Sequence, residues 1–168
     1  MDIAIAVAFV EAAQDVLQAE TTLEVTRGEM EWYDHSYTTD EVTVIISLVG
    51  EVKGTVLYSL AEAAALDLAG RLRGGPPAQG FDSLAQSGVA ELGNVITGRA
   101  GVKLSQWGYE VKISPPTLLL GRGVILSTLD LPRLFIPLHG EGVTIGLHLA
   151  LAEAGPAYRS EQKAVEMR

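Results

Sequence analysis

A carboxylate and an amide lie three positions apart in the stretch 83–106, which has the apolar spacing of one long helix. At ~100° per residue, Glu91 and Asn94 are only ~60° apart around the axis and one turn apart along it. Their side chains therefore emerge side by side. A carboxylate accepts hydrogen bonds, whereas an amide accepts and donates them. The pair predicts a polar site at which a second surface meets this helix.

The rest of this helix separates a core-facing side from an open side. The core-facing arc is apolar and contains Ala85, Val89, Leu92, Val95 and Ile96. Gly88 and Gly93 are expected to let the helix lie close to its own sheet, and Gly98 and Gly101 leave the polar side bare. Each interior glycine costs roughly 1 kcal/mol relative to alanine, which favours a function for the bare side. The alternative is that an E-x-x-N spacing occurred by chance.

The wider pattern resembles a known family. It combines the E-x-x-N pair, a small polar residue one turn earlier and a later Pro-Pro segment: Ser87, Glu91, Asn94 and Ser114-Pro115-Pro116-Thr117. These motifs are similar to those of the CheC/CheX/FliY phosphatases of bacterial chemotaxis. The run 88–121 looks most like the CheX branch, which has one such helix rather than two. The resemblance extends over most of residues 1–153.

The resemblance implies a phosphatase that acts on a phosphorylated CheY-type response regulator. In that family pattern Asn94 positions the hydrolytic water, and Glu91 pairs with the lysine of the regulator's active site. Ser87 and Gly98 are expected at the partner contact. The metal ion, Mg²⁺, is expected in the partner receiver, so this chain itself is expected to bind no metal and no cofactor.

Two other functions fit the same fold. One is an adaptor that binds a phosphorylated receiver without hydrolysing it, and the other is a dimerisation module. The resemblance also implies a homodimer that joins or exchanges strands. Retention of both Glu91 and Asn94 favours the phosphatase over the two alternatives.

Composition limits the remaining classes. The 168 residues fit one domain, predicted at 1–154, with a polar C-terminal tail at 155–168. The net charge of −9 argues against nucleic acid and anionic membranes as partners. The chain has no Cys and no apolar run of the ~20 residues that a membrane span needs. We therefore expect a cytoplasmic protein.

The pattern of elements predicts an α+β fold, with helices packed on a long, mainly antiparallel sheet. Helices are expected at 3–19, from a Ser59-x-x-Glu62 capping box to 72, and at 83–106. Strands are expected at 23–33, 42–49, 54–59, 109–113, 117–120, 123–128, 134–139 and 143–152, with a polar loop at 34–40. A helix followed by a meander occurs twice, which suggests an internal pseudo-duplication.

The positions of the histidines give little support for a His-based metal site. A hairpin centred on Glu141 would set His139 opposite Val143, so that His139 and His148 would not meet. His35 falls in the predicted loop. No nucleophile elbow or dinucleotide-binding pattern is present. A chain without a self-contained catalytic centre is consistent with one that completes the active site of another protein.

Overall fold

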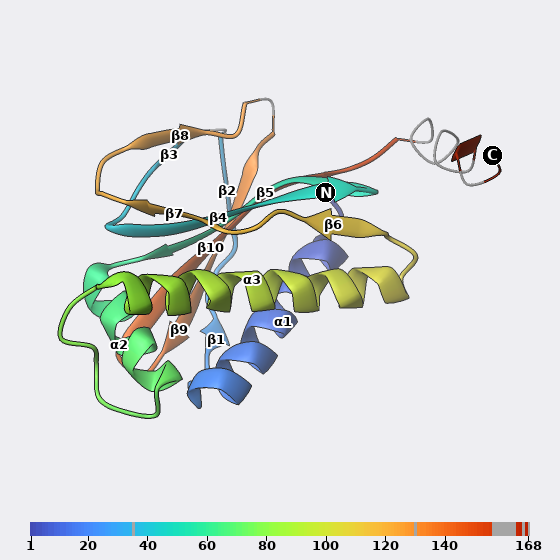
Figure 1. Ribbon diagram of the computed structural model, residues 1–168. Helices are drawn as coiled ribbons and strands as arrows, with labels where there is room; N and C mark the ends of the chain where they lie inside the picture. Colours follow the sequence, from blue (N-terminus) through green and yellow to red (C-terminus); the bar gives the residue numbers. More distant parts are fainter. Residues whose placement is uncertain (35, 130, 156–163, 166, 168) are drawn as a thin grey trace.

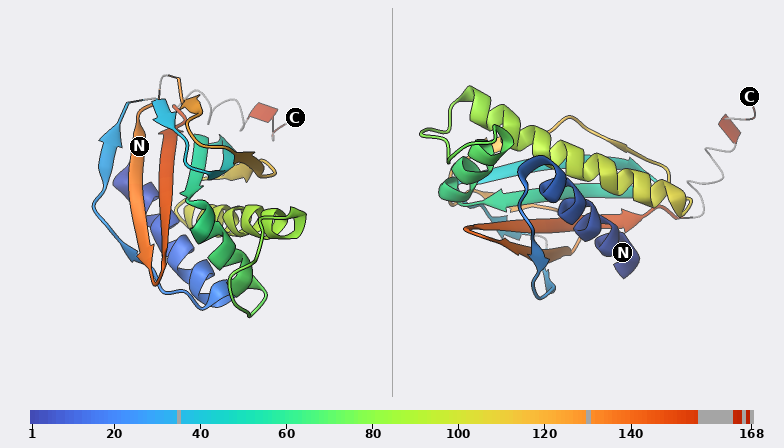
Figure 2. Two further views of the ribbon diagram at one scale, coloured as in Figure 1. Left: turned by 90° about the vertical axis from the view of Figure 1, so that its left-hand side faces the viewer. Right: turned by 90° about the horizontal axis from the view of Figure 1, so that it is seen from below.

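The computed structural model describes residues 1–34, 36–129, 131–155, 164–165 and 167 (Figure 1). Three helices lie on one side of the main sheet, as both views in Figure 2 show. They are α1 (Ile3–Thr21), α2 (Glu62–Leu72) and α3 (Ser83–Gln106). The prediction of helices packed on a mainly antiparallel sheet is confirmed. Across the described ranges, no helix is long and apolar enough to cross a membrane.

The main sheet has the order β1-β9-β10-β5-β4-β6, with β2 also pairing with β9 and β7 with β4. Its strands are β1 (Thr26–Arg27), β2 (Glu31–Tyr33), β4 (Val42–Gly50), β5 (Val52–Leu60), β6 (Val111–Ile113), β7 (Thr117–Leu120), β9 (Arg133–Gly140) and β10 (Val143–Glu153). All its pairs are antiparallel. In chain order α1 precedes β1–β5 and α3 precedes β6–β10, so the helix-then-meander order is repeated.

A second sheet of two strands, β3 (Ser36–Thr38) and β8 (Ile125–Ser127), lies on the side of the main sheet away from the helices (Figure 1). The predicted polar loop at 34–40 is therefore wrong, because its middle forms β3. The predicted strand at 23–33 is also divided in two. Gly28 lies in the break, where a Cβ would meet the Pro137 ring at 2.7 Å.

Alternation along the strands assigns one face to the core. In β10, Ile145, Leu147 and Leu149 are buried against the helices, while Gly146 and His148 point to the opposite face. The β9–β10 hairpin forms as predicted, but its register pairs His139 with Thr144 rather than Val143. The two histidines still do not meet, because His148 pairs with Phe135.

The N-terminus of α2 differs from the prediction. Ser59 remains in β5, so it does not form a capping box with Glu62. The helix begins instead after Ala61, which makes no side-chain cap, and the carboxylate of Glu41 accepts a hydrogen bond from the Glu62 backbone N–H. Ser59 pairs instead with Thr43 of β4 and Gly146 of β10, and its hydroxyl bonds across the sheet to His148.

The predicted division into a domain at 1–154 and a tail stays a prediction. The last strand, β10, ends at Glu153. Most of the predicted tail, 155–168, lies outside the described residues.

Candidate active site

One exposed face of α3, which we call the crest, carries all four predicted site residues: Ser87, Glu91, Asn94 and Gly98. Asp82 caps the helix by accepting from the Ala85 backbone N–H at 2.9 Å, and the helix runs without a break to Gln106. Buried Gly93 and Ala100 are ~160–180° from Glu91 around the axis and therefore place Glu91 opposite to the core. Ser87 and Glu91 are exposed, while Asn94 and Gly98 are half-buried.

Strand β6 borders one flank of this crest, the flank on which Asn94 lies. A Cβ on Gly98 would lie 3.9 Å from the Ile113 side chain, and one on Gly101 would lie 3.4 Å from Val111. The Ser114 backbone N–H and hydroxyl both bond to Ser47 of β4, which fixes the segment that follows β6. Asn94 thus lies on the side of α3 that borders β6, one turn before Gly98.

The other flank of the crest exposes several apolar side chains beside Arg99. It includes Leu84 at 63%, Val102 at 55% and Val95 at 36% exposure. The prediction that Val95 belongs to the core-facing arc is therefore wrong; it lies ~40° from Glu91. A carboxylate flanked by exposed apolar side chains is typical of a protein-contact surface rather than of an ordinary solvated face.

Neither polar side chain is engaged within the subunit. In the part of the chain that the structure describes, the Glu91 carboxylate and the Asn94 amide form no hydrogen bond or ion pair. Both groups therefore keep their full hydrogen-bonding capacity for another molecule.

Buried contacts fix the position of this helix. Gly93 lets it approach the sheet, since a Cβ there would lie 3.0 Å from Val44 and 3.2 Å from Tyr58. The Tyr58 and Thr97 hydroxyls are 2.8 Å apart, and Thr97 also donates to the Gly93 carbonyl. Burial raises the pKa of Tyr58 above its usual range, so its phenol stays neutral. Gly88, by contrast, faces Leu72 of α2 rather than the sheet.

The crest offers binding groups without a reaction centre of its own. Among the described residues no cluster of His, Asp or Glu could hold a metal ion. A carboxylate and an amide on a rigid helix can bind a cation, orient a water molecule and donate to a phosphoryl oxygen. Chemistry by such a pair would require a reacting bond on another molecule.

Sequence reasoning missed a second polar cluster, on the opposite face of the sheet. His148 Nε2 lies 2.9 Å from Ser59 Oγ, and His148 Nδ1 lies 2.6 Å from Arg133 Nη1. Because arginine can only donate, Nδ1 must accept and the proton of the neutral ring lies on Nε2. That tautomer donates to Ser59 and cannot take its proton, so the pair is no serine nucleophile with its base. The signal in the sequence was a polar residue in the apolar run of β10.

Comparison with known proteins gives both a matching family model and a related protein. A family model described as chemotaxis phosphatase CheX matches residues 42–139, which include the whole of α3. The CheY-P phosphatase CheX of Thermotoga maritima is 27% identical over 156 residues, 92% of this chain and 100% of that protein.

Solved structures show the same fold. A CheC-like superfamily protein from Shewanella sp. PV-4 has a TM-score of 0.81 at 22% identity, over 90% of this chain and 99% of that one. CheX of Borrelia burgdorferi, solved in a complex with CheY, BeF₃ and Mg²⁺, has a TM-score of 0.75 at 24% identity, over 88% of this chain and 97% of that one.

Proposed function

This chain belongs to the CheX family of chemotaxis phosphatases, and on that premise we propose that it dephosphorylates a CheY-type response regulator with Glu91 and Asn94. The main support for this proposal is that both side chains lie on the crest of α3 and have no partner in the described part of the subunit. The related CheY-P phosphatase from Thermotoga maritima and the CheX–CheY complex from Borrelia burgdorferi support the choice of substrate.

Asn94 positions the attacking water. Phosphoryl transfer depends on alignment and charge neutralisation more than on covalent help from the protein. The Asn94 carbonyl accepts from the water while its NH₂ donates to a phosphoryl oxygen. Buried contacts fix the position of α3 and hence of the Asn94 backbone, which lowers the entropy lost on alignment.

Glu91 anchors the complex. Its carboxylate pairs with the active-site lysine of the regulator, and the regulator supplies the Mg²⁺ that neutralises the phosphoryl group. Ser87, one turn earlier on the crest, contacts the partner. Gly98, one turn after Asn94, leaves room for the partner's backbone because it has no side chain.

The test is the rate of regulator dephosphorylation with Asn94→Ala. A candidate receiver is phosphorylated with acetyl phosphate in Mg²⁺, and its decay is followed with and without this protein. Loss of one preorganised group should slow the accelerated decay by about 10²–10³-fold. Gln106→Ala removes an exposed amide from the end of the same helix and should leave the rate unchanged. Equal acceleration by Asn94→Ala and wild type would refute the role of Asn94.

Binding separates this function from that of an adaptor. We expect Asn94→Ala to bind a beryllofluoride-activated receiver as well as wild type does, whereas Glu91→Lys should lose at least tenfold in affinity because it opposes two cations. Wild-type binding without any acceleration of decay would identify an adaptor instead.

We also propose that two copies of the chain associate through the β3–β8 sheet. This two-stranded sheet exposes Ile125 at 72% and the following Leu129 at 73%, and a two-stranded sheet has open edges. Sedimentation analysis should give a dimer for wild type and a monomer for Ile125→Asp. A wild-type monomer at all concentrations would disprove the association.

A further inference from the structure

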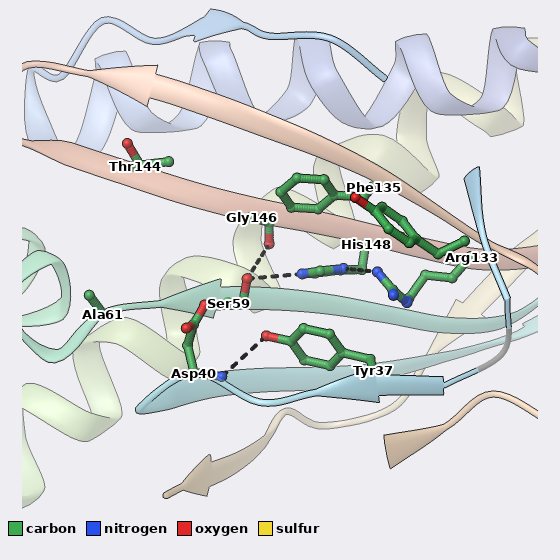
Figure 3. Close-up of a pocket in the computed structure, with 10 residues that line it drawn as sticks. Tyr37, Asp40, Ser59, Ala61, Arg133, Phe135, Thr144, Gly146 and His148 are labelled. Carbon is green, nitrogen blue, oxygen red and sulfur yellow. Dashed lines mark hydrogen bonds between the residues drawn. The ribbon is translucent and has the colours of Figure 1, made fainter. Parts of the chain in front are cut away.

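A cavity of ≈380 Å³ opens on the sheet face opposite to α3 (Figure 3). Its walls come from β2, β3, β5, β9 and β10, and the side chains that matter most are Tyr33, Tyr37, Ser59, Arg133, Phe135 and His148. The volume falls in the range of small-molecule sites. The proposed phosphatase site uses none of these residues.

Arg133 is a buried cation to which the described residues supply no anion. Only 5% of the residue is exposed, and no carboxylate of the described residues lies within ion-pair distance. Nη1 donates to His148 and Nη2 donates to the Ser36 carbonyl at 3.1 Å, while Nε has no partner. Buried charges are normally paired. This one is unusual. One N–H on each of Nη1 and Nη2 remains free of the hydrogen bonds described, whereas the Nε atom is itself buried.

Aromatic rings hold the guanidinium in place. It lies 4.9 Å from the ring centroid of Tyr33 and 5.0 Å from that of Tyr37. These cation–π contacts offset part of the free-energy cost of burying the charge. The His148 ring stacks between Tyr37 and Phe135, with centroids 4.4 and 4.9 Å away. The cavity therefore has a rigid aromatic wall beside a fixed positive charge.

Two hydroxyl groups of the cavity, those of Ser59 and Tyr37, are weakly bonded as donors. Ser59 accepts from His148 Nε2, so its own proton is left with the Gly146 carbonyl at a long 3.4 Å. The Tyr37 hydroxyl accepts from the Asp40 backbone N–H, also at 3.4 Å, and within the described ranges its proton has no acceptor. The Ser59 and Tyr37 hydroxyls can thus each donate to an acceptor on a ligand.

Gly146 keeps the floor of the cavity open. A Cβ at this position would lie 2.2 Å from Ser59 Oγ and 3.0 Å from Phe135. Any other residue would displace the Ser59–His148 bond and fill the space in front of it. The absent side chain is thus a requirement of the cavity and not of the backbone, because this glycine has no positive φ.

We propose that this cavity binds a small organic monocarboxylate with a flat or apolar body. A carboxylate has only acceptors, and its plane matches the fork of the Arg133 guanidinium. The body of the ligand packs on Phe135 and Tyr37. Asp40 lines the same cavity with an exposed carboxylate, which disfavours a second negative charge and hence phosphate or a dicarboxylate.

Benzoate and benzamide form the matched pair of probes. They have almost the same shape, but only benzoate carries the charge. Calorimetry on the full wild-type chain should show saturable 1:1 binding of benzoate and at least tenfold weaker binding of benzamide. No saturation below about 10 mM benzoate, or equal affinity for the two probes, overturns the proposal, as does tighter binding of inorganic phosphate.

Two variants localise the binding to the cavity. Arg133→Lys keeps the charge but loses the planar fork, and it should weaken benzoate binding at least tenfold. Asp40→Asn changes an exposed side chain, so the fold is preserved, and it should strengthen binding about two- to fivefold. Glu20→Gln, the control, removes a negative charge at the end of α1 and should leave the affinity for benzoate unchanged. An unchanged affinity in Asp40→Asn overturns the placement of the ligand even if Arg133→Lys fails to fold.

Discussion

His148 is expected to make the folded protein sensitive to acid. Burial, and then the neighbouring Arg133 guanidinium, lower the pKa of His148 to about 3. The groups that face its ring are Ser59 of β5, Tyr37 of β3, and Arg133 and Phe135 of β9. None of them is a carboxylate that would stabilise the imidazolium. In the unfolded chain the His pKa has its ordinary value of 6.5. Between pH 6.5 and about pH 3 the unfolded chain therefore binds a proton at this residue that the folded chain does not bind.

The magnitude follows from linkage. Between pH 6.5 and about pH 3 the unfolded state holds more protons, so the free energy of unfolding falls as the pH falls, by ~1.4 kcal/mol per unit. Between pH 7 and pH 5 this group alone should remove about 2 kcal/mol of stability. Stability from this source is fully present above pH 6.5 and is lost progressively below it.

Urea unfolding at pH 7, 6 and 5, followed by circular dichroism, measures this loss. His148→Gln provides the comparison, because its amide can accept from Arg133 and donate to Ser59 but does not titrate. We expect wild type to lose about 2 kcal/mol more than the variant between pH 7 and pH 5. His139 and the surface carboxylates are common to both proteins and cancel. Parallel losses would show that His148 titrates normally and would refute the proposed proton arrangement.

Two other substitutions test the support of α3 and the register of the sheet. Tyr58→Phe removes the buried hydroxyl that bonds to Thr97, and the free energy of unfolding should fall by about 1 kcal/mol; an unchanged value would show that the bond contributes nothing. Gly54→Ala places a Cβ 2.0 Å from the Ala150 carbonyl at φ +136° and should cost at least ~3 kcal/mol in the same urea assay. Gly80→Ala, with open space around it, is the control, and equal effects would refute the argument.

The long helix was predictable to the residue because its signals are local. An Asp at position 82 caps the first turn, apolar residues recur at helical spacing, and Gly108 follows the last turn with a φ of +84°. The E-x-x-N pair lies on that same helix, so the exposed position of Glu91 and the half-buried position of Asn94 beside it also followed from spacing. Two predictions on this helix were wrong. Val95 is exposed because it lies at the boundary of the apolar arc, and Gly88 faces α2 rather than the sheet.

The β3–β8 sheet and the cavity could not be predicted in this way. The segment Ser36–Thr38 is polar, and it is a strand only because Ile125–Ser127 pairs with it from far along the chain. Ser59 and His148 are 89 residues apart in sequence. A local pattern assigned Ser59 to a helix cap, whereas the cross-strand bond that competes with the cap is visible only in the folded chain.

Strand β5 connects the two faces of the protein through consecutive residues. Tyr58 points to the helices and bonds to Thr97, three residues beyond Asn94, whereas Ser59 points to the cavity and bonds to His148. A slip of one residue in β5 would exchange these two directions. Gly54 opposes such a slip, since only a glycine tolerates both its positive φ and the close Ala150 carbonyl. The register of this one strand therefore determines both how α3 packs on the sheet and which residues line the floor of the cavity.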